Sequence, residues 1–150
     1  MKSILRTTNS EPRTGFVVSV NTSNRKGISK IPVESIKLKK DYGVEDDAHG
    51  GGKRQVSILT AESGNKIEEF KPGLFAENIT TKDIELNKLY VGDTIKIGKA
   101  ILSLSEKGKV CPSKCSIYYK LGDCIMPKEG LFFNVIKEGI VKAGDIVEII

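Results

Sequence analysis

Residues 91–97 read Val-Gly-Asp-Thr-Ile-Lys-Ile, and residues 143–149 read Ala-Gly-Asp-Ile-Val-Glu-Ile. Each stretch places a Gly-Asp turn before a short run of alternating apolar and polar residues, which is typical of a strand with one buried face. An Asp at such a turn can bond to the backbone amides that follow it. We therefore expect two similar strand entrances. Short strands with Gly between them favour a barrel or sandwich over a parallel α/β fold.

Three further stretches predict strands. Residues 15–22 and 55–60 are rich in β-branched residues, which suit strands. Residues 31–40 alternate in part, and Pro32 places that strand at a sheet edge or at a strand start because proline cannot donate to the ladder. The sequence thus predicts a mainly β protein.

The remaining organisation is simple. Residues 61–70 predict the one substantial helix, with Thr60 as its N-cap. Residues 77–104 predict several short strands. We expect residues 1–14 to form an N-terminal lead-in and residues 15–150 to form one domain, because no linker or second domain is evident.

Composition excludes several classes of protein. The chain has 150 residues, of which 39% are hydrophobic and 29% charged, as in a soluble globular domain. The net charge of +5 is scattered without a dense basic run, which argues against nucleic acid as a partner. No apolar run is long enough for a membrane span, and the N-terminus lacks the apolar core of a secretory signal. We expect a cytoplasmic protein whose thiols stay reduced.

The most chemically suggestive stretch is 108–130, GKVCPSKCSIYYKLGDCIMPKEG. It carries Cys111, Cys115 and Cys124, and four lysines lie among or beside them: Lys107, Lys109, Lys114 and Lys120. Ammonium groups favour the thiolate, which is both a nucleophile for sulfur transfer and a ligand for soft metals. Two alternatives stay open: buried cysteines that only pack, or a Cys3His zinc site completed by His49, although the spacing is unlike that of a zinc knuckle.

A glycine-rich segment, 46–57 (DDAHGGGKRQVS), precedes the strand predicted at 55–60. Its small residues would let backbone amides approach an anion, and Lys53 and Arg54 would add positive charge. It is not a Walker loop, and a flexible surface hairpin is the alternative. His49 is the only His; as a general acid or base it would need a partner such as Asp47.

Taken together, these segments resemble the MOSC family, which is named for the C-terminal domain of molybdenum-cofactor sulfurases. The likeness runs in order from about Gly15 to Ile150 and is greatest to the short, stand-alone bacterial type. It rests on five pieces: GVEDDAHGGGKRQVSIL, GLFAENITT, LYVGDTIKIGKAIL, GKVCPSKCSIYYKLGDCIMPKEG and KAGDIVEI. The resemblance implies a β-barrel-like fold with a few short helices.

The resemblance also implies functional residues. Cys111 falls on the family's key Cys and would be the metal ligand, while Cys115 matches the second Cys of short bacterial members. The residues implied in cofactor binding are His49, Lys53, Arg54, Glu77, Asn78 and Lys109. Two positions depart from the family: Asp46 and Ala76 each stand where Gly is usual.

The implied function is binding of the molybdenum cofactor (molybdopterin), sulfur transport as a persulfide on Cys111, or both. The sulfur would come from a partner cysteine desulfurase, which carries pyridoxal phosphate that this chain has no site for. Alternatives are a molybdenum-dependent reductase of N-hydroxylated compounds with an outside electron donor, or a non-catalytic zinc-stabilised module.

Overall fold

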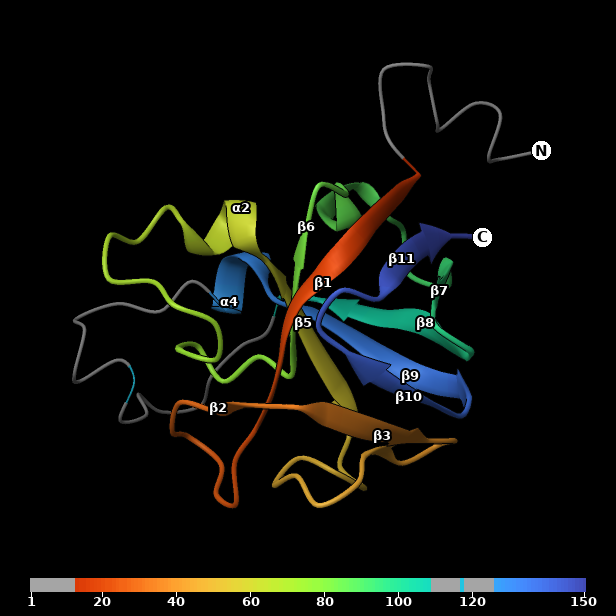
Figure 1. The fold of residues 1–150 in the computed structure, drawn as a ribbon, viewed down its shortest axis with the longest axis horizontal. Helices are drawn as coiled ribbons and strands as arrows, with labels where there is room; N and C mark the ends of the chain where they lie inside the picture. The colour runs from red at the N-terminus through yellow and green to blue at the C-terminus, as the bar shows by residue number, and fades with distance from the viewer. Residues whose placement is uncertain (1–12, 109–116, 118–125) are drawn as a thin grey trace.

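A computed structural model describes residues 13–108, 117 and 126–150 of the chain. The described part is mainly β (Figure 1). Its strands are β1 (Thr14–Thr22), β2 (Ile31–Val33), β3 (Ser35–Lys39), β4 (Gly43–Val44), β5 (Val56–Thr60), β6 (Ile79–Lys82), β7 (Thr94–Ile97), β8 (Ala100–Lys107), β9 (Leu131–Lys137), β10 (Gly139–Lys142) and β11 (Ile146–Ile149). The helical pieces are α2 (Ala61–Gly64), the 3-10 turn η1 (Leu86–Lys88) and α4 (Met126–Glu129).

A closed barrel forms the body of the molecule. Its strands follow the order β11-β7-β8-β9-β5-β6-β1, and β1 pairs with β11 to complete the ring. All of these pairings are antiparallel except that of β5 with β6. The nine-residue β1 serves three neighbours: β11 along its start, β6 along its middle and β2 along its end. The predicted mainly β, barrel-like fold is therefore confirmed.

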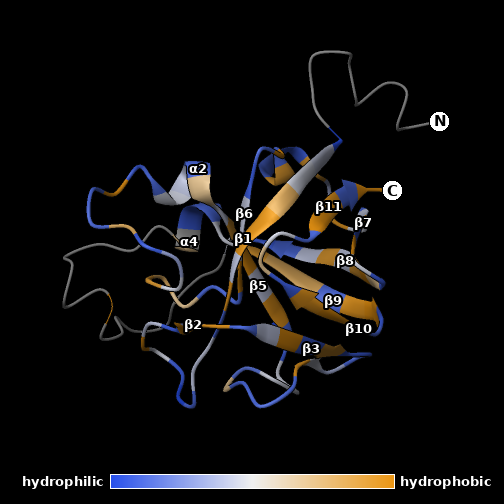
Figure 2. Cartoon of the chain, in the orientation of Figure 1, coloured by the Kyte–Doolittle hydropathy of each residue, from blue (hydrophilic) through white to orange (hydrophobic). Residues whose placement is uncertain are grey.

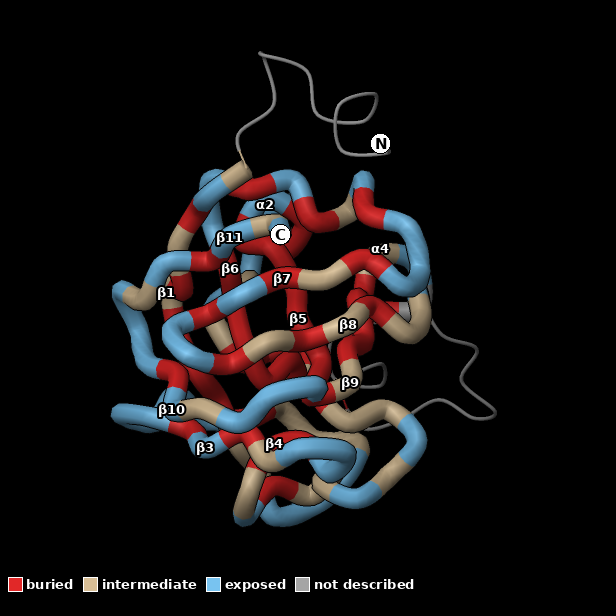
Figure 3. The backbone as a smooth tube through the Cα atoms, turned by 90° about the vertical axis from the view of Figure 1, so that its right-hand side faces the viewer, coloured by how far each residue is buried: buried red, intermediate tan, exposed pale blue. Residues whose placement is uncertain are grey.

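The barrel interior is filled by alternate side chains of its strands. On β8, Leu102 and Leu104 point inward, and on β9 the inward positions include Phe133 and Val135. These side chains are fully or almost fully buried. Figure 2 shows that hydrophobic residues concentrate on the strands while the connecting loops are mostly hydrophilic. Figure 3 shows that buried residues follow the central strands β5 and β6, while exposed residues lie mostly at the outer turns.

A second apolar cluster covers the outer face of β5 and β9. It contains Leu59, Leu74, Phe75, Ile117, Met126 and Phe132. Because this cluster packs against one face of β5 and the barrel core against the other, every residue of β5 is buried. The strand therefore joins the two hydrophobic regions of the protein.

The stretch 31–40 forms two strands instead of the single strand that we expected. β2 lies at the edge of the large sheet, where Pro32 pairs with Asn21, and β3 joins a separate sheet of order β10-β3-β4. The interruption at Glu34 lets the chain pass from one sheet to the other. The edge position predicted for Pro32 is confirmed.

The helix predicted over 61–70 is much shorter. α2 ends at Gly64, and the chain continues in turns that bring the ring of Phe70 into a stack with Phe75, with ring centroids 6.0 Å apart. Gly is a poor helix former, and tertiary packing of the aromatic ring outweighs the local helical preference. The predicted N-cap is confirmed, because the Ser63 amide donates to Thr60 Oγ1 (3.1 Å).

The two Gly-Asp turns have the same geometry, as their sequences predicted. Asp93 Oδ2 accepts from the Tyr90 amide (2.8 Å), and Asp145 Oδ2 accepts from the Lys142 amide (3.0 Å). The bonded amide lies three residues before each Asp, whereas we had expected amides that follow it. Each Asp carboxylate thus closes a turn with the residues that precede it, immediately before its strand begins.

Each helical piece within the described residues falls short of the length and apolar character that a membrane-spanning helix needs.

We expect Phe133→Ala to lower the free energy of unfolding by about 3–5 kcal/mol, because it leaves a cavity in the barrel core. Ile136→Ala on the same strand is the matched control, since Ile136 is 46% exposed. We expect the control to change stability by about 0.5 kcal/mol or less. Urea denaturation measures both, and equal losses would contradict the assigned barrel interior.

Candidate functional site

The candidate site is built around Lys30, a residue that the sequence analysis did not single out. Its side chain is fully buried. Lys30 Nζ donates to both carboxylate oxygens of Asp47 (2.8 and 3.0 Å), and it lies 3.1 Å from Ser23 Oγ and 3.0 Å from His49 Nδ1. Ser23 Oγ itself donates to the Arg25 carbonyl (2.9 Å), so it accepts from Lys30. The ammonium therefore has three kinds of acceptor for its three protons.

Asp47 is the anionic partner in this cluster, and its side chain is also fully buried. It accepts from Lys30 and from the backbone amides of Ser23 (3.0 Å) and His49 (3.1 Å). Burial alone would raise the pKa of the carboxyl, but the hydrogen bonds from Lys30 and Ser23 and the Lys30 charge outweigh it. The pKa of Asp47 is consequently held well below its usual range, and the carboxylate stays ionised.

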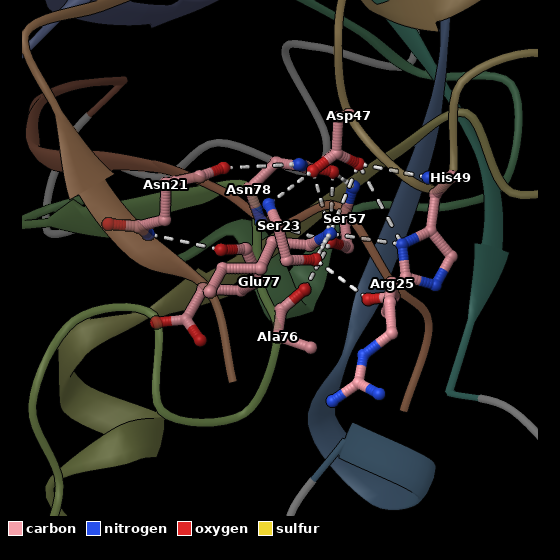
Figure 4. Close-up of polar contacts among 10 residues, drawn as sticks. Asn21, Ser23, Arg25, Asp47, His49, Ser57, Ala76, Glu77 and Asn78 are labelled. Atoms are coloured by element: carbon pink, nitrogen blue, oxygen red, sulfur yellow. Dashed lines mark hydrogen bonds and ion pairs between the residues drawn. The ribbon is translucent and has the colours of Figure 1, made fainter. Parts of the chain in front are cut away.

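Asp47 and His49 therefore do come together, as a catalytic pairing would require, but Lys30 lies between them. The His49 ring nitrogen Nδ1 is 3.7 Å from Asp47 Oδ2, which is too far for a hydrogen bond, and 3.0 Å from Lys30 Nζ. Its side chain is 26% exposed. Figure 4 shows the ring at the border of the polar cluster. His49 thus has one nitrogen in the cluster and the other available at the surface.

The glycine-rich segment has a packing role. A Cβ on Gly50 would lie 2.6 Å from the Tyr42 ring, and one on Gly51 would lie 3.1 Å from it. Tyr42 therefore lies directly against these glycines, and a larger residue at either position would push its ring aside. Lys53 is exposed and has no side-chain partner among the described residues. Of the two basic residues predicted to attract an anion here, Lys53 is the one left unpaired.

Arg54 is held by a carboxylate. Its Nε and Nη2 donate to the two carboxylate oxygens of Glu106 (3.0 and 3.1 Å), and the guanidinium lies over the ring of Phe132, 5.5 Å from its centroid. Glu106 is near the end of β8, just before the segment that carries the cysteines. The Arg54–Glu106 pair thus joins the glycine-rich loop to the strand from which the cysteine segment departs.

Glu77 is fully buried beneath the same region. It accepts from the amides of Gly73 (3.0 Å) and Phe75 (3.2 Å) and from Thr80 Oγ1 (2.8 Å). Burial raises the pKa of its carboxyl, and these hydrogen bonds only partly offset that effect. The amides of Gly73 and Phe75 both donate to this carboxyl, which thereby fixes the turn 73–77.

Asn78 is fully buried as well. Its Oδ1 accepts from the Ser57 amide (3.1 Å) and hydroxyl (3.2 Å), and its Nδ2 donates to the Asn21 carbonyl (3.2 Å). Figure 4 shows how Asn21, Ser57, Glu77 and Asn78 lie together. In the described structure Glu77 and Asn78 support the site from below. Their contact with a cofactor stays a prediction.

Two unusual backbone conformations flank this network. Asp46 and Ala76, the two residues found where the resemblance leads us to expect Gly, both have φ of 65°. Asp tolerates this left-handed region, whereas for Ala it costs roughly 1–2 kcal/mol. The Ala76 carbonyl lies 3.2 Å from Ser57 Oγ and shares the single hydroxyl proton with Asn78 Oδ1, which helps to hold the strained turn.

The three cysteines and Lys109 lie outside the described residues, so the roles predicted for Cys111, Cys115 and Lys109 remain predictions. Ile117 is the one described residue of 109–125, and it is buried in the second apolar cluster with Phe75 and Phe132. Within 13–108, 117 and 126–150, no group of three or more His, Cys, Asp or Glu could hold a metal ion.

The sequence of this chain matches a known protein family over the segments that form the site. The MOSC domain profile matches residues 45–148, which include the glycine-rich loop, the Glu77-Asn78 turn and the cysteine segment. The chain belongs to the MOSC domain family.

Two curated relatives have related sequences. Protein YiiM of Escherichia coli is 24% identical over 91% of this MOSC chain, which spans 69% of that protein. The uncharacterized protein YflK of Bacillus subtilis is 25% identical over 83% of the chain, which spans 63% of YflK.

Solved structures support the MOSC fold. The YUAD protein of Bacillus subtilis superposes with a TM-score of 0.73 at 17% identity, covering 90% of this chain and 94% of that one. YiiM of Geobacillus stearothermophilus gives a TM-score of 0.71 at 22% identity, covering 91% and 75%. At these identities the likeness concerns the fold alone.

For this MOSC domain we expect Asp47→Ala to lower the free energy of unfolding by about 3–5 kcal/mol at neutral pH, because it leaves the Lys30 ammonium buried without its anion. Glu45→Ala is the matched control. Glu45 forms a long, exposed pair with Lys39 (3.9 Å) and should matter by less than about 1 kcal/mol.

The same pair predicts a pH dependence. Because the folded-state pKa of Asp47 is depressed, the unfolded chain takes up the proton first as the pH falls. The stability that the ionised Asp47 contributes is thus fully present above the ordinary Asp pKa of about 3.9 and is lost as the pH falls below it. Denaturation midpoints across acid pH measure this loss, and Asp47→Ala should lack that part of the slope. An unchanged slope in the variant would contradict the assignment.

We expect Ala76→Gly to stabilise the domain by up to about 1 kcal/mol, because glycine adopts the left-handed conformation without the penalty of a Cβ. Ala100→Gly is the control, since Ala100 lies in β8 with ordinary φ and is fully buried. That control should destabilise by about 0.5–1 kcal/mol or more. Thermal denaturation distinguishes the two signs.

Proposed function

We propose that this MOSC domain presents the Cys111 sulfur beside an anion-attracting loop, either as a carrier of sulfane sulfur or as a ligand in molybdenum-cofactor binding. The proposal rests chiefly on one observation, the bidentate pair between Arg54 and Glu106. This pair holds the glycine-rich loop to the end of β8, and Cys111 follows that strand closely in sequence. Membership of the MOSC domain family adds to the support.

The donors at the loop suit an anionic group. His49 is partly exposed, and Lys53 is exposed without a partner among the described residues. Arg54 would contribute less than expected, because Glu106 already balances its charge. In the cofactor version, His49 and Lys53 would hold the phosphate of molybdopterin, with Lys109 as a further predicted contact. The bound group would supply a redox-active metal for which a soft thiolate is a fitting ligand.

In the carrier version the partner is a cysteine desulfurase. The Cys111 thiolate attacks the outer sulfur of the persulfide on the desulfurase. A sulfur–sulfur bond forms at Cys111, the one at the donor cysteine breaks, and that cysteine leaves as a thiolate. The exchange needs no net oxidant or reductant. Lysines near Cys111 in sequence would favour the attacking thiolate.

Sulfur loading tests the carrier version. With a cysteine desulfurase and isotopically labelled cysteine, we expect the wild-type chain to gain one reducible labelled sulfur and Cys111→Ser to gain none. Cys124→Ser is the matched control, because it removes a thiol from the same segment, and it should still load. Equal loading of Cys111→Ser and wild type would refute the carrier role.

Elemental analysis tests the cofactor version. Protein made in a host that produces the cofactor should copurify with molybdenum and pterin, and Cys111→Ser should retain much less molybdenum. Zinc in place of molybdenum would favour the stabilising metal module. A chain that takes up neither sulfur nor molybdenum would rule out both versions of the proposal.

A further inference from the structure

The buried Lys30 makes an unusual contact with His49, and that contact determines what His49 can do. An ammonium group donates hydrogen bonds and accepts none. Lys30 Nζ lies 3.0 Å from His49 Nδ1, so Nδ1 must accept from it. The single proton of the neutral imidazole is then on Nε2.

The competing arrangement would place the proton on Nδ1 and donate it to Asp47. The geometry disfavours this arrangement, because Asp47 Oδ2 is 3.7 Å from Nδ1. That oxygen also already accepts from Lys30 Nζ (3.0 Å) and from the His49 amide (3.1 Å). A proton on Nδ1 would moreover face the Lys30 ammonium at close range.

A positively charged residue, Arg25, lies close to this cluster, because its carbonyl accepts from Ser23 Oγ, which in turn accepts from Lys30 Nζ. Figure 4 shows the imidazole of His49 and the guanidinium of Arg25 on the same side of the cluster, away from Asn21 and Glu77. Arg25 is exposed, and its guanidinium has no partner among the residues that the structure describes. A neutral N–H donor and an unpaired guanidinium on one side of the cluster are together suited to an oxyanion.

We infer that Lys30 is a positioning residue that holds His49 with its proton on Nε2, so that His49 and Arg25 together bind a phosphate-type oxyanion. The inference deepens the proposed function, on which its biological meaning rests, by adding Arg25 to the anion site that His49 and Lys53 form there. Lys30 contributes from beneath without contacting the anion. Ser23 links the two halves, because it accepts from Lys30 and donates to the Arg25 carbonyl.

The position of the proton can be measured directly, since His49 is the only His of the chain. Protein labelled with nitrogen-15 histidine gives one imidazole in the NMR spectrum, which is recorded at mildly alkaline pH. We expect an unprotonated, hydrogen-bonded Nδ1 and a protonated Nε2. A proton on Nδ1 in the wild-type chain would overturn the inference.

Lys30→Met removes the donor to Nδ1. Asp47 then lacks its ammonium partner, and we expect the imidazole proton to move to Nδ1, from which it can donate a hydrogen bond to the Asp47 carboxylate. A merely structural role of Lys30 would leave the proton on Nε2, so a folded variant with unchanged nitrogen shifts would contradict a positioning role. If the variant does not fold, the wild-type measurement and the phosphate titration below still decide.

The anion site is tested with inorganic phosphate, against chloride at the same ionic strength. We expect a saturable shift of the His49 Nε2–H signal in wild type. Arg25→Ala should weaken phosphate binding by about tenfold or more, as expected for loss of a hydrogen bond between charged groups. Lys26→Ala, which removes the same charge from the next exposed residue, should bind as wild type does.

Absence of a saturable shift, or equal binding by the Arg25 and Lys26 variants, would exclude the oxyanion site. A phosphomonoester titrated in parallel separates the two sources of such a group: tighter binding than inorganic phosphate indicates a phosphate carried on a larger molecule. All of these measurements can be made in the Cys111→Ser chain. Their failure is therefore distinguishable from failure of the sulfur or molybdenum tests.

Discussion

The buried ammonium of Lys30 is the interaction on which the functional face depends. Its side chain binds Asp47 and His49 from the glycine-rich segment, and its backbone amide donates to the Gly73 carbonyl (2.8 Å) in the turn that leads to Glu77. One residue thus ties together three loops that are distant in sequence. A buried ion pair adds little stability compared with apolar packing, but loss of one partner is costly. The loops are therefore constrained to one arrangement.

The site combines two kinds of polar residue that play different parts. Glu77 and Asn78 are fully buried, and their hydrogen bonds go to the chain itself, so they define the shape of the turn. His49 and Lys53 reach the surface and can meet a ligand. Rigid support below and accessible donors above are what a binding site needs, because ordering of the donors then costs little on binding.

Some glycines of this protein are explained by close packing and not by the approach of a ligand. The run at 50–52 suggested an open backbone for an anion, yet Gly50 and Gly51 lie directly against the ring of Tyr42. At position 76 the reverse occurs, because Ala occupies a left-handed conformation that glycine would adopt more easily. The backbone shape is thus retained in the second case although the residue that suits it is absent.

Several elements of the fold have a local cause and could be predicted from short stretches of the chain. Alternation gave the strands, the Gly-Asp pairs gave two equivalent turns, Thr60 gave a helix cap, and Pro32 gave an edge. These follow from the preferences of a few neighbouring residues.

The remaining features depend on contacts between segments that are distant in sequence. The helix ends after Gly64 because Phe70 stacks on Phe75. Arg54 pairs with Glu106, which lies more than fifty positions away in sequence. Lys30 likewise lies at the centre of the site, although nothing in GISKIPV distinguishes this lysine from the other basic residues. Burial and charge pairing arise between segments that meet only when the barrel closes, so no local pattern can reveal them.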